Sequence, residues 1–253
     1  MMTTLFALLK RELLEHKNIW RMPLILLGMA VLLKLSLSFG NLAINVQVPE
    51  ALQLDNTIDG LLNSAIGKTV YVMNQIVMLV MFVVAIFYAL TCLYNERQDQ
   101  SVLFWRSLPI ADWLTVLSKV LVALLLVPLV VIICQTLVVV LFFGADSGSY
   151  LGNHYMASMP LLAKKVLWSL LPVVAWCVLC SSIANKNPFL LAFITPIIFV
   201  LIDKLFLQGV ISQTLLINRL TGVEQYTTSL FVSGLVFSLV CLTFATIKRS
   251  QRI

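Results

Sequence analysis

The sequence predicts an all-α integral membrane protein with six transmembrane helices. Hydrophobic residues make up 60% of the chain, charged residues make up only 11%, and the mean hydropathy is +1.00. Soluble domains contain about 25% charged residues, so this composition excludes an ordinary soluble protein. Because a bundle of membrane helices with short loops is one packing unit, we expect a single domain over residues 1–253.

Six apolar segments are long enough to cross a bilayer, since a transmembrane helix needs roughly 20 largely apolar residues. They are residues 20–40, 70–93, 114–143, 164–184, 188–207 and 227–247. Pro128, Pro172 and Pro196 fall within spans three, four and five. Proline removes a backbone hydrogen bond from a helix interior, so these residues can kink their helices.

The distribution of basic residues predicts the orientation of the spans. An even number of spans places both termini on the same side, and Lys and Arg are enriched on the cytoplasmic side. With both termini inside, the basic residues facing the cytoplasm outnumber those outside: Lys10, Arg11, Lys17, Arg21, Arg97, Arg106, Lys119, Lys186, Lys248, Arg249 and Arg252 against Lys68, Lys164, Lys165, Lys204 and Arg219. The sequence therefore predicts an N-in, C-in topology.

An amphipathic helix is expected before the first span. In the segment TLFALLKRELLEHKN, residues 4–18, four leucines (Leu5, Leu8, Leu9 and Leu13) share one helical face and the charged residues lie elsewhere. Such a helix suits the inner surface of the membrane, where basic residues meet anionic lipid. The alternative is a simple cytoplasmic lead into the first span.

A catalytic role is not expected for this chain. The two histidines, His16 and His154, fall on opposite sides of the predicted membrane, and Asp203 is the only carboxylate well inside a span. The segment IGKT at 66–69 resembles the end of a P-loop, but Leu62 stands where that motif needs its first glycine. We therefore expect no enzyme activity, no cofactor and no metal on this chain. The net charge of +6 is attributed to basic residues at the inner face, and no nucleic acid partner is expected.

A polar connector separates spans two and three. Residues 94–113, YNERQDQSVLFWRSLPIADW, mix charged residues with apolar ones and include Pro109 shortly before the third span. We expect a short amphipathic helix here, held at the cytoplasmic membrane surface by Trp105 and Trp113, with its charges available to a partner. The alternative is that these charges are merely solvated and the tryptophans merely anchor the surface.

The run ERQDQSVLFWRSLPIAD, residues 96–112, resembles the signature segment of ABC-2 type permeases, the six-span membrane subunits of ABC exporters. The shared features are a Glu-Arg pair, a small residue (Ser101) five positions after the glutamate, an apolar stretch, a Leu-Pro pair and a lysine in the third span. Gln100 stands where the family often has glycine. Residues 209–229, GVISQTLLINRLTGVEQYTTS, form an irregular apolar segment before the last span. With this segment, the basic amphipathic N-terminus and the six spans, the resemblance covers essentially the whole chain.

The resemblance implies a permease subunit of an ATP-driven exporter in a bacterial inner membrane, with a dimeric pathway formed by a second copy or a paralogue. ATP and Mg would bind to separate ABC ATPase subunits. Closure of those subunits would push on the N-terminal helix and on the connector. The resemblance therefore gives an ATPase-coupling role to Glu96, Arg97, Asp99, Arg106, Pro109 and Asp112.

Ionisable residues inside spans are a second group of candidates. A charge at the bilayer centre costs about 2.5–3.5 kcal/mol on insertion scales. We hypothesise that Lys34 and Asp203 are paired or line the substrate path or a dimer contact, as the family's use of its first and fifth spans implies. The equally supported alternative is that Lys34 snorkels outward and Asp203 marks the outer interface. For the polar residues of spans two and three, helix-to-helix hydrogen bonding is the favoured explanation: Asn74, Gln75, Gln135 and Thr136.

Two other functions remain open from the sequence. One is a self-contained channel or secondary transporter, although such proteins often carry more ionisable residues or broken helices at the midplane. The other is a membrane scaffold that transports nothing. The residues by themselves identify neither a substrate nor a direction of transport.

Overall fold

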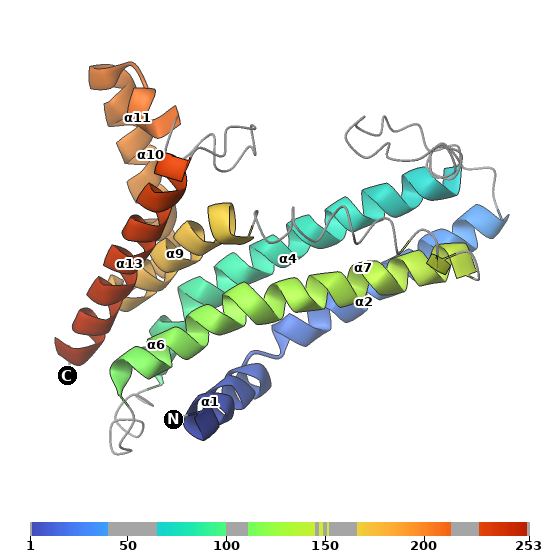
Figure 1. Ribbon diagram of the computed structural model, residues 1–253, viewed down its shortest axis with the longest axis horizontal. Helices are drawn as coiled ribbons and strands as arrows, with labels where there is room; N and C mark the ends of the chain where they lie inside the picture. The colour runs from blue at the N-terminus through green and yellow to red at the C-terminus, as the bar shows by residue number, and fades with distance from the viewer. Residues whose placement is uncertain are drawn as a thin grey trace. The chain divides into compact units, whose positions relative to one another are not determined.

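The computed structural model of the protein describes residues 2–39, 65–99, 111–144, 147–148, 151, 166–213 and 228–251. Within these ranges all regular secondary structure is helical (Figure 1). Six helical stretches of the described residues are long and apolar enough to cross a membrane. The all-α prediction is therefore confirmed for the described residues, and the six predicted segments are confirmed as helices long and apolar enough to span. The N-in, C-in topology stays a prediction.

The described elements are, in order, α1 (Met2–Glu15), α2 (Asn18–Phe39), α4 (Ala65–Gln98), α6 (Asp112–Leu121), η2 (Val122–Leu126), α7 (Val127–Phe143), η4 (Val166–Leu170), α9 (Leu171–Ile183), α10 (Pro188–Leu207), α11 (Val210–Ser212) and α13 (Thr228–Gln251). The spans are α2, α4, the succession α6–η2–α7, the succession η4–α9, α10 and α13. The main difference from the predicted ends is in α4, which continues beyond Leu93 to Gln98. Arg97 lies in its last turn, where a cation offsets the negative end of the helix dipole.

Two further elements were predicted outside the spans. The helix expected before the first span is present as α1, and its position along the membrane surface stays a prediction. The coupling helix expected between spans two and three falls on residues 100–110, which lie outside the described residues.

The chain divides into two compact units, each described here by itself. Unit 1 consists of Met1–His16, Ala85–Leu126 and Leu162–Ile253, and unit 2 consists of Lys17–Val84 and Val127–Leu161. Unit 1 therefore contains α1, the second part of α4, α6, η2, and the helices from η4 to α13. Unit 2 contains α2, the first part of α4, and α7. The predicted single domain stays a prediction.

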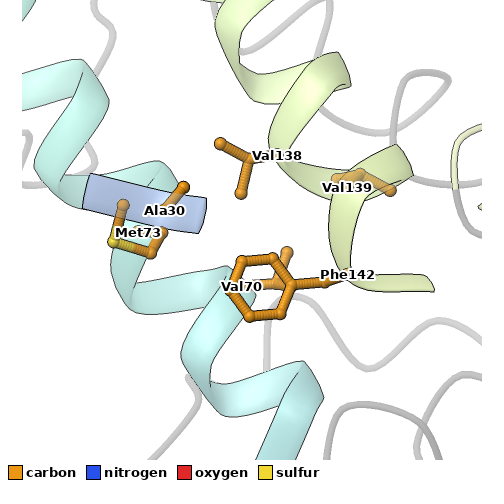
Figure 2. Close-up of a cluster of buried hydrophobic side chains, with 6 residues drawn as sticks. All are labelled: Ala30, Val70, Met73, Val138, Val139 and Phe142. Carbon is orange, nitrogen blue, oxygen red and sulfur yellow. The ribbon is translucent and has the colours of Figure 1, made fainter. Parts of the chain in front are cut away.

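The core of unit 2 is an apolar cluster contributed by three helices. Its members are Ala30 from α2, Val70 and Met73 from α4, and Val138, Val139 and Phe142 from α7. Figure 2 shows the α7 side chains facing those of α4, with Ala30 beside them. In a bilayer, lipid is as apolar as the side chains, so close packing rather than water exclusion holds such helices together. The small side chain of Ala30, which is fully buried, allows a close approach of α2.

Unit 1 is built around α9, which packs along α13 and also contacts α10 and α6 (Figure 1). Trp176 of α9 stacks on Phe237 of α13, with ring centroids 6.3 Å apart. The Trp176 indole N–H also donates to the backbone carbonyl of Ala192 in α10, at 3.2 Å. Ala192 precedes Pro196 by four residues, and proline has no N–H to bind the carbonyl one turn earlier. The indole therefore satisfies the carbonyl that Pro196 leaves without its usual helical donor.

Two π-helical segments of the described residues, η2 and η4, each end shortly before a proline, Pro128 and Pro172 respectively. A proline inside a helix interrupts the hydrogen-bond ladder, and a wider π turn is one way in which the backbone adapts. The π turns therefore lie beside two of the three prolines that can kink these spans.

Candidate functional site: a buried ion network in unit 1

Charged residues from four helices of unit 1 meet in its interior. We call them the ion network: Arg11 and Glu12 of α1, Glu96 of α4, Asp112 and Lys119 of α6, and Arg249 of α13. These residues lie near both ends of the chain and on both sides of the connector between spans two and three. Since direct ion pairs join them, the end of α1, the end of α4, the start of α6 and the end of α13 lie at the same end of unit 1.

Lys119 is the most deeply buried member, with a side chain that is 0% exposed. Its ammonium Nζ lies 2.6 Å from Glu12 Oε1 and 3.1 Å from Glu96 Oε1. Glu12 also accepts a hydrogen bond from the hydroxyl of Tyr88, at 2.8 Å. A buried charge is tolerated where it has opposite charges and hydrogen bonds around it. Lys119 therefore joins α1 to α4 from its position on α6.

Glu96 is the point at which the other helices converge. Its carboxylate lies 3.3 Å from Arg11 Nη2, 3.1 Å from Lys119 Nζ and 3.4 Å from Arg249 Nη2. Arg249 extends the network through its Nε, which lies 3.3 Å from Asp112 Oδ1. The carboxylate of Glu96 thus holds cations from α1, α6 and α13 at the end of α4.

The network is balanced in charge, with three basic and three acidic side chains. Balance matters because removing one partner of a buried pair leaves a charge uncompensated, which costs roughly 3–5 kcal/mol. Arg11 has a further contact with Glu15, 2.7 Å away and more exposed. The expected consequence is that the four helix ends are held to one another firmly.

Two groups next to Lys119 have shifted pKa values. Burial by itself would raise the pKa of Glu12, but the charge and hydrogen bond of Lys119 and the hydrogen bond of Tyr88 outweigh it, so this pKa lies below its ordinary value. Burial also lowers the pKa of His16, more than the nearby carboxylate of Glu12 raises it. His16 Nε2 lies 3.7 Å from Glu12 Oε2, and its ring meets Tyr88 edge to face at 4.7 Å. With this lowered pKa the imidazole is neutral at pH 7, and the contact with Glu12 is not an ion pair there.

A second junction ties the end of α4 to the end of α9. The Arg97 guanidinium donates to the carbonyl of Ala184, at 2.9 Å, and to that of Ser181. The Tyr94 hydroxyl donates to the carbonyl of Lys186. The last carbonyls of a helix lack partners within the helix, so a cation at this position satisfies them and complements the helix dipole.

The structure places the predicted coupling residues in different surroundings. Glu96 and Asp112 belong to the ion network, Arg97 binds the end of α9, and Asp99 is exposed. Arg106 and Pro109 lie outside the described residues. Glu96 is 5% exposed, so its charge is not available to a partner as the sequence led us to expect. The reason is that α4 continues past Leu93 and turns Glu96 toward α1 and α6.

The two ionisable span residues belong to different units. Lys34, in unit 2, donates from Nζ to the carbonyl of Leu141 on α7. Asp203, in unit 1, is 2% exposed and accepts a hydrogen bond from the Ser212 N–H at 2.6 Å. It thereby fixes the turn into α11, where Gln208 and Gly209 have positive φ angles of 55° and 82°. A place for Lys34 and Asp203 on a substrate path or at a dimer contact stays a prediction.

Four members of the ion network were not among the predicted site residues: Arg11, Glu12, Lys119 and Arg249. A usable signal existed for Lys119, because it lies inside the predicted third span, where any charge needs a partner. No comparable signal exists for Glu12 or Arg249, which lie outside the predicted spans among other charged residues.

No protein-family model, no curated protein and no solved structure matches the chain. The class of the protein follows from its helices: it is a multi-pass α-helical membrane protein with six helices, among the described residues, that are able to span.

Proposed function

We propose that this chain is the membrane subunit of an ATP-driven transporter of the ABC-2 type, an exporter of a bacterial inner membrane. It forms a dimeric pathway with a second copy or a paralogue, and separate ABC ATPase subunits bind ATP and Mg. The resemblance of residues 96–112 and the six spans support this proposal. The observation that carries it is the convergence of α1, α6 and α13 on Glu96 of α4.

A subunit driven from outside needs a rigid connection between the surface that is pushed and the helices that move. In this proposal the ATPase acts on α1 and on the connector between α4 and α6. Arg11 and Glu12 attach α1 to the ends of those two spans through Glu96 and Lys119. Because breaking one buried pair costs roughly 3–5 kcal/mol, the attached ends respond to a push together.

The same contacts support the proposed topology. Glu96 and Asp112, which flank the connector, both bind Arg249 near the C-terminus, and Glu96 also binds Arg11 near the N-terminus. Both termini and the connector are then at one membrane surface. The excess of basic residues makes this the cytoplasmic surface, where an ATPase would have access to ATP.

Purification from the native membrane in mild detergent tests the proposal. The expected result is an associated subunit that carries a P-loop, and ATP-dependent solute movement by the reconstituted complex. Solute movement by the chain alone, without ATP, would instead favour a channel or secondary transporter. A chain that binds no ATPase and moves no solute would favour a scaffold, and either result would contradict the proposal.

A matched pair of variants distinguishes an effect on ATPase coupling from an effect on folding. Arg11→Ala removes a cation from Glu96, while Lys10→Ala removes a cation from the exposed side of the same helix. Under the proposal, Arg11→Ala lowers ATP hydrolysis by the complex relative to Lys10→Ala at equal amounts of inserted protein. Equal hydrolysis by the two variants would contradict a coupling role for the ion network.

A further inference from the structure

Asn74 and Gln135 form a buried amide pair in unit 2, inside the second and third spans. Asn74 lies on α4 and Gln135 on α7, and they are 6% and 7% exposed. The Gln135 amide Nε2 donates to the backbone carbonyl of Asn74, at 3.4 Å. The side-chain oxygen of Asn74, Oδ1, is buried and has no hydrogen-bond partner among the described residues. The pair thus contains one satisfied contact and one buried acceptor that needs a donor.

The absence of a partner for Asn74 Oδ1 within the described ranges is unusual, because this oxygen lies beside apolar residues. Met73, its neighbour on α4, belongs to the apolar cluster, and Val138 of the same cluster lies less than one turn beyond Gln135 on α7 (Figure 2). Buried polar groups in proteins almost always have a partner, and in a bilayer no bulk water supplies one. An amide turned over would place its N–H donors at this position, and they would need a partner equally.

Among the polar residues predicted to bond between helices in these spans, Gln135 and Thr136 have hydrogen-bond partners. Gln75 is exposed, whereas the Asn74 side-chain oxygen is buried without a partner in the described part of the chain. Gln135 joins α7 to α4 through the backbone carbonyl. The Thr136 hydroxyl donates to the carbonyl of Ile132 in its own helix, at 2.6 Å. If the Asn74 side chain joined two helices as that of Gln135 does, it would reach a group on a neighbouring helix.

We propose that Asn74 and Gln135 form a hydrogen-bonding site for small neutral polar groups within the membrane part of unit 2. The ligand is a water molecule or a hydroxyl or amide group of a neutral solute. An ion is disfavoured, because two uncharged amides offset little of the cost of removing an ion from water. The ammonium of Lys34 is bound to the carbonyl of Leu141, which lies about 9 Å along α7 from Gln135 at 1.5 Å per residue.

Cysteine substitution with a small water-soluble thiosulfonate reagent tests the site in membrane vesicles. Asn74→Cys is compared with Met73→Cys and Val77→Cys, two buried apolar positions on the same helix. We expect modification of Asn74→Cys to be at least about tenfold faster, because a thiol reacts as the thiolate and ionises only where water reaches it. The unsubstituted protein, whose five cysteines are buried, provides the baseline. Equal rates at the three positions would overturn the proposal.

A cysteine at the second residue of the pair tests the site even if Asn74→Cys does not insert into the membrane. Gln135→Cys is compared in the same way with Val138→Cys, which is fully buried in the apolar cluster. Faster modification at Gln135→Cys supports the site, and equal modification overturns it.

Glycerol is the probe that distinguishes the two candidate ligands, water and a hydroxyl-bearing solute. Slower modification of Asn74→Cys in the presence of glycerol assigns the site to hydroxyl-bearing solutes, and an unchanged rate assigns it to water; both support the site. The assignment to a transported solute rests on the proposed function, whereas the site itself does not. Labelling needs no ATPase in the vesicles, so equal modification rates would not contradict the ATPase proposal. Absence of an ATPase would likewise not contradict the labelling result.

Discussion

The ammonium of Lys119 lies 2.6 Å from the carboxylate of Glu12, and both side chains are buried, at 0% and 2% exposure. The two residues are 107 positions apart in the chain. Each supplies the charge that makes burial of the other tolerable. This pair attaches α1 to the third span, and the rest of the ion network extends the attachment to α4 and α13.

Removing both members of this pair should cost less than the sum of removing each one. We expect Lys119→Met to reduce the free energy of unfolding by roughly 3–5 kcal/mol, because it leaves Glu12 buried without its main cation. Glu12→Gln combined with Lys119→Met should cost less than the sum of the single variants, since Glu96 keeps Arg11 and Arg249. Unfolding of purified protein in mixed micelles measures this double-mutant cycle. Strict additivity would contradict the direct pairing.

Arg249 should be replaceable by lysine only in part. Its guanidinium reaches Glu96 through Nη2 and Asp112 through Nε, and a single ammonium cannot reproduce this fork. We expect Arg249→Ala to destabilise the protein by up to roughly 3–5 kcal/mol, the cost of breaking a buried ion pair, and Arg249→Lys to fall between it and the natural protein. The adjacent Lys248→Ala serves as a control, with an expected change within about 0.5 kcal/mol. Equal effects of the alanine variants would contradict the bridging role.

Acid should weaken the attachment of α1 in two stages. The folded pKa of His16 is lowered from 6.5, so its stabilising contribution is present above pH 6.5 and is lost as the pH falls below that value. The folded pKa of Glu12 is lowered from 4.5, so its contribution is complete above pH 4.5 and is lost as the pH falls toward the folded value. Unfolding temperatures measured from pH 8 downward should decline in this order. His16→Phe should flatten the first stage and Glu12→Gln the second; unaltered profiles in these variants would argue against the assignment.

The hydrogen bond from Trp176 to Ala192 should depend on Pro196. Trp176→Phe keeps an aromatic ring beside Phe237 but removes the N–H that satisfies the Ala192 carbonyl. We expect a cost of about 0.6–1.7 kcal/mol, the range found for hydrogen bonds in membrane proteins. In a Pro196→Ala background the helix supplies its own donor to this carbonyl, so the same substitution should cost less. An undiminished cost in that background would show that the ring, not the hydrogen bond, matters.

The location of the six spans was predictable from the sequence because the bilayer has a fixed thickness and excludes charge. A segment of sufficient length and hydrophobicity crosses it whatever its neighbours are, and the predicted segments agree with α2, α4, α6–η2–α7, η4–α9, α10 and α13. The presence of a helix before the first span was equally predictable from its own periodicity.

Tertiary packing decided which faces of those helices are buried in the protein and which are exposed. Leucines on one side of α1 suggested contact with lipid, yet Leu8 is buried in the protein together with Glu12, one turn later. Lipid and protein interior are alike apolar, so a hydrophobic pattern cannot distinguish the two. Glu12 and Arg249 resemble any solvated charge in the sequence, and their burial depends on partners supplied by Lys119 and Glu96 from distant positions. Electrostatic compensation at short range is a property of three-dimensional contact, and it was visible only once α1, α4, α6 and α13 were brought together.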